Sequence, residues 1–186
     1  MIKITTHTTT TTTTETHMPK RRVQTTKVNG KRVRIVTTTG KNGTKVSVQA
    51  AAPKEWMLQA AQVRALRAMP EYARTAADVL RGVGKFTLAG DQNAAKRGPR
   101  AQQEAIAAGM TPGEHDVRIY MAGGRLGLIE NKVGKAKLLP TQEARHPLLS
   151  ALGFTRQAVV RAVTEEDAAR QAVELVRGWL AETAVA

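Results

Sequence analysis

The sequence predicts an α/β fold in which helices flank a mixed central sheet, preceded by a separate three-stranded β-meander. From residue 55 onward, segments with helical periodicity alternate with short segments rich in Val, Ile and Leu, which is typical of a layered α/β domain. Residues 21–50 instead contain three Val- and Thr-rich segments separated by turn sequences. The length of 186 residues accommodates one ordinary domain with an appendage, but not two full-sized domains.

The first 20 residues form a Thr-rich arm that contains the low-complexity run Thr8–Thr14. Because such a segment has little to bury, we expect it to be flexible in isolation. It also lacks the apolar core of a signal peptide. No apolar run in the chain approaches the roughly 20 residues that span a bilayer, so no membrane partner is expected.

Residues 21–50 are predicted to form the basic β-meander, with strands over Val23–Val28, Arg32–Thr38 and Thr44–Gln49. Asn29-Gly30 favours a type I′ turn, because both turn positions need positive φ angles. The first 50 residues hold ten basic side chains and one acidic one, so they carry +9 of the formal net charge of +14. The meander is either a flap that grips DNA or an element for dimerisation or docking.

Residues 54–186 are predicted to form the main domain after a linker at 50–53. The expected elements of its first half are helices over 55–69 and 70–81, a strand over 86–88, a polar basic loop over 90–100 and a helix over 101–108. The second helix is expected to begin at Pro70, because proline is favoured at the first helical position.

The second half is predicted to contain hairpin strands over 116–121 and 125–132, a basic loop over 135–140, a helix over 141–152, a strand over 158–162 and a final helix beginning at Thr164. Pro147 is expected to kink or loosen the helix that contains it. The final helix is expected to bury one apolar stripe, formed by Ala172, Leu175, Val176, Trp179 and Leu180.

The hairpin places three charged residues where they can meet. Glu130 and Lys132 share one face of their strand, because strand side chains alternate. A two-residue turn would direct Asp116 to the opposite face, whereas a three-residue loop over 122–124 pairs Asp116 with Glu130. Three-residue loops need a glycine in the left-handed region, and this loop has two. The sequence therefore predicts the three-residue loop.

Two carboxylates and a lysine are costly on a covered sheet face, unless the oxygens hold a hard cation. Mg²⁺ bound there would polarise a phosphate oxygen and lower the pKa of a bound water, and Lys132 could stabilise the developing charge. The alternative is a cluster of solvated surface charges, which contributes little.

The overall charge points to a polyanionic partner. Lys and Arg number 29 against 15 Asp and Glu, and the pI is near 10.8. Nucleic acid is the commonest such partner, and an anionic membrane surface is the alternative. Aromatic residues are only 3%, which favours contacts with duplex or junction phosphates over base stacking. The absence of cysteine excludes disulfides, thiolate zinc sites and cysteine nucleophiles.

An ordered set of residues resembles the VRR-NUC branch of the PD-(D/E)XK nucleases. The set comprises the glycine-containing approach Gly109–Asp116, the Glu-x-Lys motif in Leu128–Lys132, Gln142 and Leu152-Gly153. Upstream, the chain is similar in having Glu55 early in the first helix and Asn93 followed by basic residues. The resemblance covers about residues 55–179, and it departs from the family at His115, where a proline is usual, and at Pro147.

The resemblance implies a restriction-endonuclease-like core and a Mg²⁺- or Mn²⁺-dependent endonuclease. Asp116 and Glu130 would bind the metal, together with the backbone carbonyl of Asn131. Lys132 would be the catalytic lysine and Gln142 would orient water or phosphate. Glu55 would support the metal shell, although an acid at a helix N-terminus is also favoured by the helix dipole. For Gln142, the alternative is an ordinary polar residue of the first helical turn.

Loop residues flanking this centre are candidates for DNA contacts: Asn93, Lys96, Arg97, Arg100, Lys135 and Lys137. Their alternative is solvated loop charge. Small stand-alone members of the family resemble Holliday junction resolvases, which implies branched or flapped DNA as substrate and a homodimer. Two other functions remain open, namely a non-catalytic DNA-binding or architectural protein and a component of an assembly such as a viral particle. We expect a cytoplasmic protein, or one in the host cytoplasm or a viral particle if a phage encodes it.

Overall fold

A computed structural model describes residues 20–29, 31–91 and 98–182. The chain divides into two compact units, one ending at Ala51 and the other beginning at Ala52. This division falls in the expected linker. Most of the Thr-rich arm lies outside the described residues, as do Asn93, Lys96 and Arg97.

The first unit is the three-stranded meander that the sequence predicts. Its antiparallel strands are β1 (Lys20–Val28), β2 (Lys31–Gly40) and β3 (Gly43–Ala50), in the order β1-β2-β3. Val28 pairs with Lys31, so the first turn has two residues, and Asn29 adopts a positive φ of 49°. Gly40 pairs with Gly43 across the second turn. Asn29 therefore begins the tight turn with a positive φ, which asparagine tolerates.

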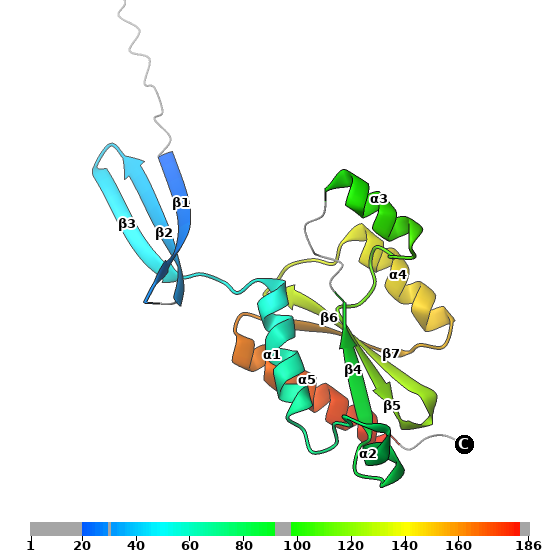
Figure 1. Cartoon of the computed structure of the whole chain (residues 1–186). Helices are drawn as coiled ribbons and strands as arrows, with labels where there is room; N and C mark the ends of the chain where they lie inside the picture. The colour runs from blue at the N-terminus through cyan, green and yellow to red at the C-terminus, as the bar shows by residue number, and fades with distance from the viewer. Residues whose placement is uncertain (1–19, 30, 92–97, 183–186) are drawn as a thin grey trace, which may run out of the picture. The chain divides into compact units, whose positions relative to one another are not determined.

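The second unit is built on a mixed sheet of four strands, in the order β4-β5-β6-β7 (Figure 1). The strands are β4 (Phe86–Gly90), β5 (Val117–Met121), β6 (Arg125–Val133) and β7 (Arg156–Ala162). Strand β5 is antiparallel to both of its neighbours, β4 and β6, whereas β6 and β7 run parallel. The β5–β6 connection is the short helix η1 (Ala122–Gly124), in which Gly123 and Gly124 have positive φ angles. The predicted three-residue loop is therefore confirmed.

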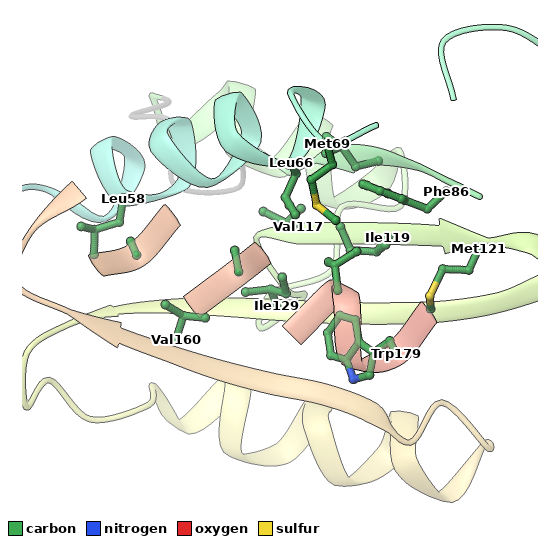
Figure 2. Close-up of a cluster of buried hydrophobic side chains, with 14 of the residues drawn as sticks. Leu58, Leu66, Met69, Phe86, Val117, Ile119, Met121, Ile129, Val160 and Trp179 are labelled. Carbon is green, nitrogen blue, oxygen red and sulfur yellow. The ribbon is translucent and has the colours of Figure 1, made fainter. Parts of the chain in front are cut away.

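Helices cover both faces of this sheet. The helices of this unit are α1 (Glu55–Arg67), α2 (Ala76–Leu80), α3 (Pro99–Ala107), α4 (Pro140–Ala151) and α5 (Glu165–Ala181). Helices α1 and α5 pack on one face, and α4 lies on the other (Figures 1 and 2). Thr164 begins α5 as expected, because its side chain accepts a hydrogen bond from the Asp167 N–H.

The main core lies between the sheet and the α1–α5 pair (Figure 2). It is mostly aliphatic, as the low aromatic content predicts. The buried face of α5 consists of Ala168, Ala172, Val176 and Trp179, while Leu175 and Leu180 are only partly buried. Gly127 allows Trp179 to approach, since a Cβ at residue 127 would lie 2.6 Å from the indole ring. A mixed sheet flanked by helices is therefore established.

Two sequence-based expectations are wrong. The helix predicted over 70–81 is reduced to α2, because Tyr72 forms a β-bridge with Phe86 and the Ala73 N–H donates to the Phe86 carbonyl. Backbone pairing with β4 thus replaces the first helical turns. Pro147 does not interrupt α4, which continues from Pro140 to Ala151. Pro147 and its i−4 residue Glu143 are both exposed, so water can satisfy the carbonyl that proline leaves unbonded.

None of the helices in the described part of the chain combines the length and apolar character needed to cross a membrane.

Candidate active site

The β5–β6 hairpin brings Asp116 next to the Glu-x-Lys motif. Val117 pairs with Ile129, so Asp116, one residue before β5, lies opposite Glu130 at the end of the ladder. The Asp116 Oδ2 accepts a hydrogen bond of 2.7 Å from the Asn131 N–H. The three-residue loop therefore places the two acidic residues together, as the sequence analysis predicts.

Lys132 is buried beside Glu130. Its Nζ donates to the Glu130 Oε1 at 2.7 Å and lies 3.6 Å from the Glu55 Oε1. Glu130 and Lys132 are only 1% and 3% exposed, whereas Glu55 is exposed at the N-terminus of α1. These charges are thus not a solvated surface cluster, which was the alternative.

Gln142 holds Glu130 in place from the first turn of α4. Its Oε1 accepts from the Leu139 N–H at 2.9 Å, which leaves its amide nitrogen to donate to the Glu130 Oε1 at 2.5 Å. Glu130 Oε1 therefore receives two donors, while its buried Oε2 has no hydrogen-bond partner among the described residues. The structure gives Gln142 a contact with the carboxylate itself, where the sequence analysis expected contact with water or phosphate.

The approach to Asp116 packs tightly against α4. Gly113 has a φ of +87°, and a Cβ there would lie 2.3 Å from the Thr141 carbonyl oxygen. The neighbouring Glu114 accepts two hydrogen bonds from the Arg145 guanidinium. These contacts connect the segment that carries Asp116 to the helix that carries Gln142.

Helix α1 also positions Asp116, through a residue that the sequence analysis did not select. The Gln59 side-chain amide donates to the main-chain oxygens of Asp91 and Asp116, at 3.0 and 2.8 Å. It thereby connects the end of β4 to the start of β5. Gln59 lies one helical turn after Glu55, and that spacing is the only sequence signal that could have suggested it.

A stacked histidine pair lies beneath the site. His115 and His146 have ring centroids 3.9 Å apart, and His146 Nε2 is 3.9 Å from the Glu130 Oε2. His115 is fully buried in the loop segment that leads to Asp116. Burial, followed by the charge of His146, lowers the pKa of His115 to about 3, so the ring is neutral near pH 7.

Burial makes the two carboxylates difficult to ionise. Burial and, after it, the neighbouring Asp116 carboxylate raise the pKa of Glu130 to about 7, while the hydrogen bond and charge of Lys132 oppose the shift. Burial also raises the pKa of Asp116, against the opposing effects of the Asn131 N–H and Lys132. A cation at this position would offset both effects, because positive charge stabilises the ionised form.

The oxygen ligands present are suited to a hard divalent cation. Asp116 and Glu130 lie side by side, and the Glu130 Oε2 is available to such an ion. Among the described residues, no three side chains of Asp, Glu, His or Cys are grouped to hold a metal by themselves. A bound ion would therefore need main-chain, water or substrate oxygens as further ligands, which is common for Mg²⁺.

The predicted DNA contacts are only partly described. Arg100 is exposed on α3 and pairs with Glu104 at 2.9 Å. Lys135 and Lys137 are exposed in the loop between β6 and α4. That loop connects Lys132 to Gln142, so both lysines lie in the sequence between two residues of the site.

Comparisons of the chain with protein-family models, curated proteins and solved structures gave no match.

Proposed function

We propose that this protein is a metal-dependent nuclease that hydrolyses DNA phosphodiester bonds. The observation that carries the proposal is the buried Glu130–Lys132 pair, 2.7 Å apart, with Asp116 beside it at the end of the same hairpin. Removing such charges from water costs several kcal/mol per ion. Folded proteins retain such unfavourable arrangements mostly where function requires them.

Asp116 and Glu130 would hold Mg²⁺ or Mn²⁺, and the family resemblance adds the Asn131 carbonyl as a further ligand. When bound, the ion polarises a phosphate oxygen and lowers the pKa of a coordinated water. Lys132 provides a fixed positive charge for the attacking oxygen or the pentacovalent phosphate. Gln142 keeps the Glu130 carboxylate in one orientation, and Glu55 shares Lys132 with it.

The substrate class follows from the charge and the family resemblance. A net charge of +14 supports binding to a polyanion. We propose that the substrate is branched or flapped DNA and that the protein acts as a homodimer, because symmetric cleavage of a junction needs two sites. Arg100, Lys135 and Lys137 are the described candidates for phosphate contacts.

The test is cleavage of a labelled four-way junction, a 5′ flap and a plain duplex, with Mg²⁺, Mn²⁺ or EDTA. Glu130→Gln and Lys132→Met should abolish metal-dependent cutting while DNA binding persists. Glu104→Gln is the matched control, because Glu104 is an exposed acid on α3 whose partner Arg100 is also exposed. Tight, salt-sensitive binding without cleavage under any metal would instead favour a non-catalytic DNA-binding protein.

A further inference from the structure

A groove of about 720 Å³ begins at the candidate site and follows helix α1. One wall is a continuous stripe of α1, formed by Glu55, Trp56, Gln59, Ala60, Val63 and Arg67. The other wall is the edge strand β4 with the residue that follows it, and Asp116 lies at the end of the groove nearest the site. The groove therefore shares Glu55 and Asp116 with the proposed catalytic centre.

The side chains along this groove change character from one end to the other. Acidic Glu55 and Asp116 occupy the site end, Val63 and Leu88 provide an apolar surface, and Arg67 follows at the other end of α1. Arg67 is exposed and forms no ion pair with the residues that the structure describes. These three features occur in succession along the groove. A cation held by the carboxylates would contact one phosphate of a DNA strand, the apolar surface would contact a base, and the Arg67 guanidinium would contact a further phosphate.

Trp56 is the most informative residue in the groove. Its side chain is 62% exposed, although the chain contains only two tryptophans and 3% aromatic residues. The other tryptophan, Trp179, is 8% exposed in the core. An indole left largely in solvent next to Glu55 offers a flat surface on which a base can stack.

The length of the stripe sets the reach of a bound strand. From Glu55 to Arg67 the helix rises about 18 Å at 1.5 Å per residue. That distance corresponds to no more than roughly five base steps at the duplex rise of 3.4 Å per step. Arg67 is thus placed to contact a phosphate other than the one at the metal-binding carboxylates.

We propose that this groove binds an unpaired nucleotide segment of the DNA strand that is cut, with one base stacked on Trp56 and a distant phosphate on Arg67. The inference rests on the proposed function and specifies its substrate. A base within a duplex is already stacked on both sides, so only a frayed, flapped or displaced nucleotide can use the indole. The groove therefore explains why a branched or flapped substrate would be preferred over plain duplex.

The first test uses tryptophan fluorescence of the full chain in EDTA, where metal-dependent cleavage cannot occur. Titration with short oligothymidylate should quench the emission of exposed Trp56 and leave buried Trp179 unaffected. Trp56→Phe should remove the quenching. Anisotropy of a labelled oligonucleotide establishes when the protein is saturated with DNA. Unchanged wild-type tryptophan emission at saturation would overturn the proposal. An indole of Trp56 that is already shielded from solvent in the free protein would also overturn it.

The second test measures affinity with matched variants. Trp56→Ala should weaken oligothymidylate binding about tenfold, within the range of base–aromatic stacking. Tyr120→Ala removes an exposed aromatic at the far end of β5 and should leave binding unchanged. Arg67→Gln should reduce the salt dependence of binding by about one counterion. Arg64→Gln is its control, because Arg64 is an equally accessible arginine of α1 that pairs with Glu165.

The two proposals can fail separately. Quenching of Trp56 without cleavage of any substrate would retain the groove as a DNA site and reject the nuclease. Trp56→Ala could instead cleave flaps at the wild-type rate, with unchanged affinity for DNA and unchanged preference for flaps. That result would support the nuclease and overturn the assignment of the groove as a DNA-binding site. Unfolding midpoints of the five variants used in the two tests establish that each remains folded.

Discussion

The two faces of strand β6 are equally buried but chemically different. Ile129 is 0% exposed and belongs to the aliphatic core under α1 and α5. Its neighbour Glu130 is 1% exposed and bonds to Lys132 and to Gln142 of α4. The Ile129 face therefore stabilises the fold, while the Glu130 face contains buried charges whose desolvation destabilises it. Burial alone thus does not identify a hydrophobic core.

The largest expected difference is between substitutions at these two neighbours. Glu130→Gln should lower metal-dependent cleavage by about a thousandfold or more, comparable to the loss of a key charge-stabilising group. Because it removes a buried ionisable group and keeps its shape, it should not lower the free energy of unfolding at pH 8. Ile129→Ala should instead cost about 2–5 kcal/mol through lost packing.

Cleavage kinetics and urea unfolding of the two variants check this dissociation. Comparable destabilisation by both would show that the α4 face is an ordinary structural layer, which would contradict the comparison.

Substitution of Gly113 should have a smaller effect, which acts on the packing of the Asp116 segment against α4. Gly113→Ala places a Cβ against the Thr141 carbonyl and is expected to destabilise the protein by about 1–3 kcal/mol, the usual cost of overpacking. It should also reduce cleavage, because Gln142 follows Thr141. Gly109→Ala is the matched control: that glycine also has a positive φ, of +96°, but its Cβ would meet nothing within 4 Å. Equal loss in both variants would point to backbone conformation alone.

The pH dependence of stability should reflect the raised pKa of Glu130. In the unfolded chain this carboxyl ionises near its ordinary pKa of 4.5, whereas in the folded protein it ionises near 7. At this group the folded state thus holds more protons between these values, so its contribution to stability falls as pH rises from about 4.5 to 7. The lowered pKa of His115 acts in the opposite sense, so the contribution of Glu130 is measured as the difference between wild type and Glu130→Gln in thermal unfolding without metal.

Relative to Glu130→Gln, the wild-type midpoint should fall between pH 5 and pH 8, and Mg²⁺ should raise the wild-type midpoint at pH 8 more than at pH 5. The same pH dependence of the midpoint in wild type and variant would contradict the raised pKa of Glu130.

The smallest effects are expected from lysines outside the buried face. Lys135→Gln and Lys137→Gln should leave the free energy of unfolding within about 0.5 kcal/mol of wild type, since both side chains are exposed. Each should reduce the salt dependence of DNA binding by about one counterion if it contacts phosphate. Fluorescence anisotropy at several salt concentrations measures this, with Arg81→Gln, at the C-cap of α2, as an exposed control that pairs with nearby Asp78.

Local patterns predicted much of the architecture. Asn29-Gly30 and the loop 122–124 specified their turns because positive φ angles are confined largely to Gly and Asn. The three-residue loop then determined the register that places Asp116 beside Glu130. Thr164 marked the start of α5 through a side-chain cap only three residues long. These interactions are short in sequence, so the residues themselves identify them.

The remaining features depend on contacts distant in sequence. The segment after Pro70 pairs with Phe86 in place of forming a helix, because a β-bridge and an edge-to-face contact between Tyr72 and Phe86 outweigh local helix propensity. Helix α4 places His146 against the buried ring of His115, a contact between residues 31 positions apart in the sequence. Likewise, the role of Gln59 follows from the approach of β4 and β5 to α1.

The strands, the turns and the pairing of Asp116 with Glu130 can therefore be read from the sequence, because period-two alternation and turn geometry are local. The burial of Glu130, the hydrogen bond from Gln142 to Glu130, and the groove with an exposed Trp56 depend on the tertiary fold. Burial and long-range hydrogen bonds arise when α1 and α4 pack against the sheet, and no short segment of the chain contains both partners.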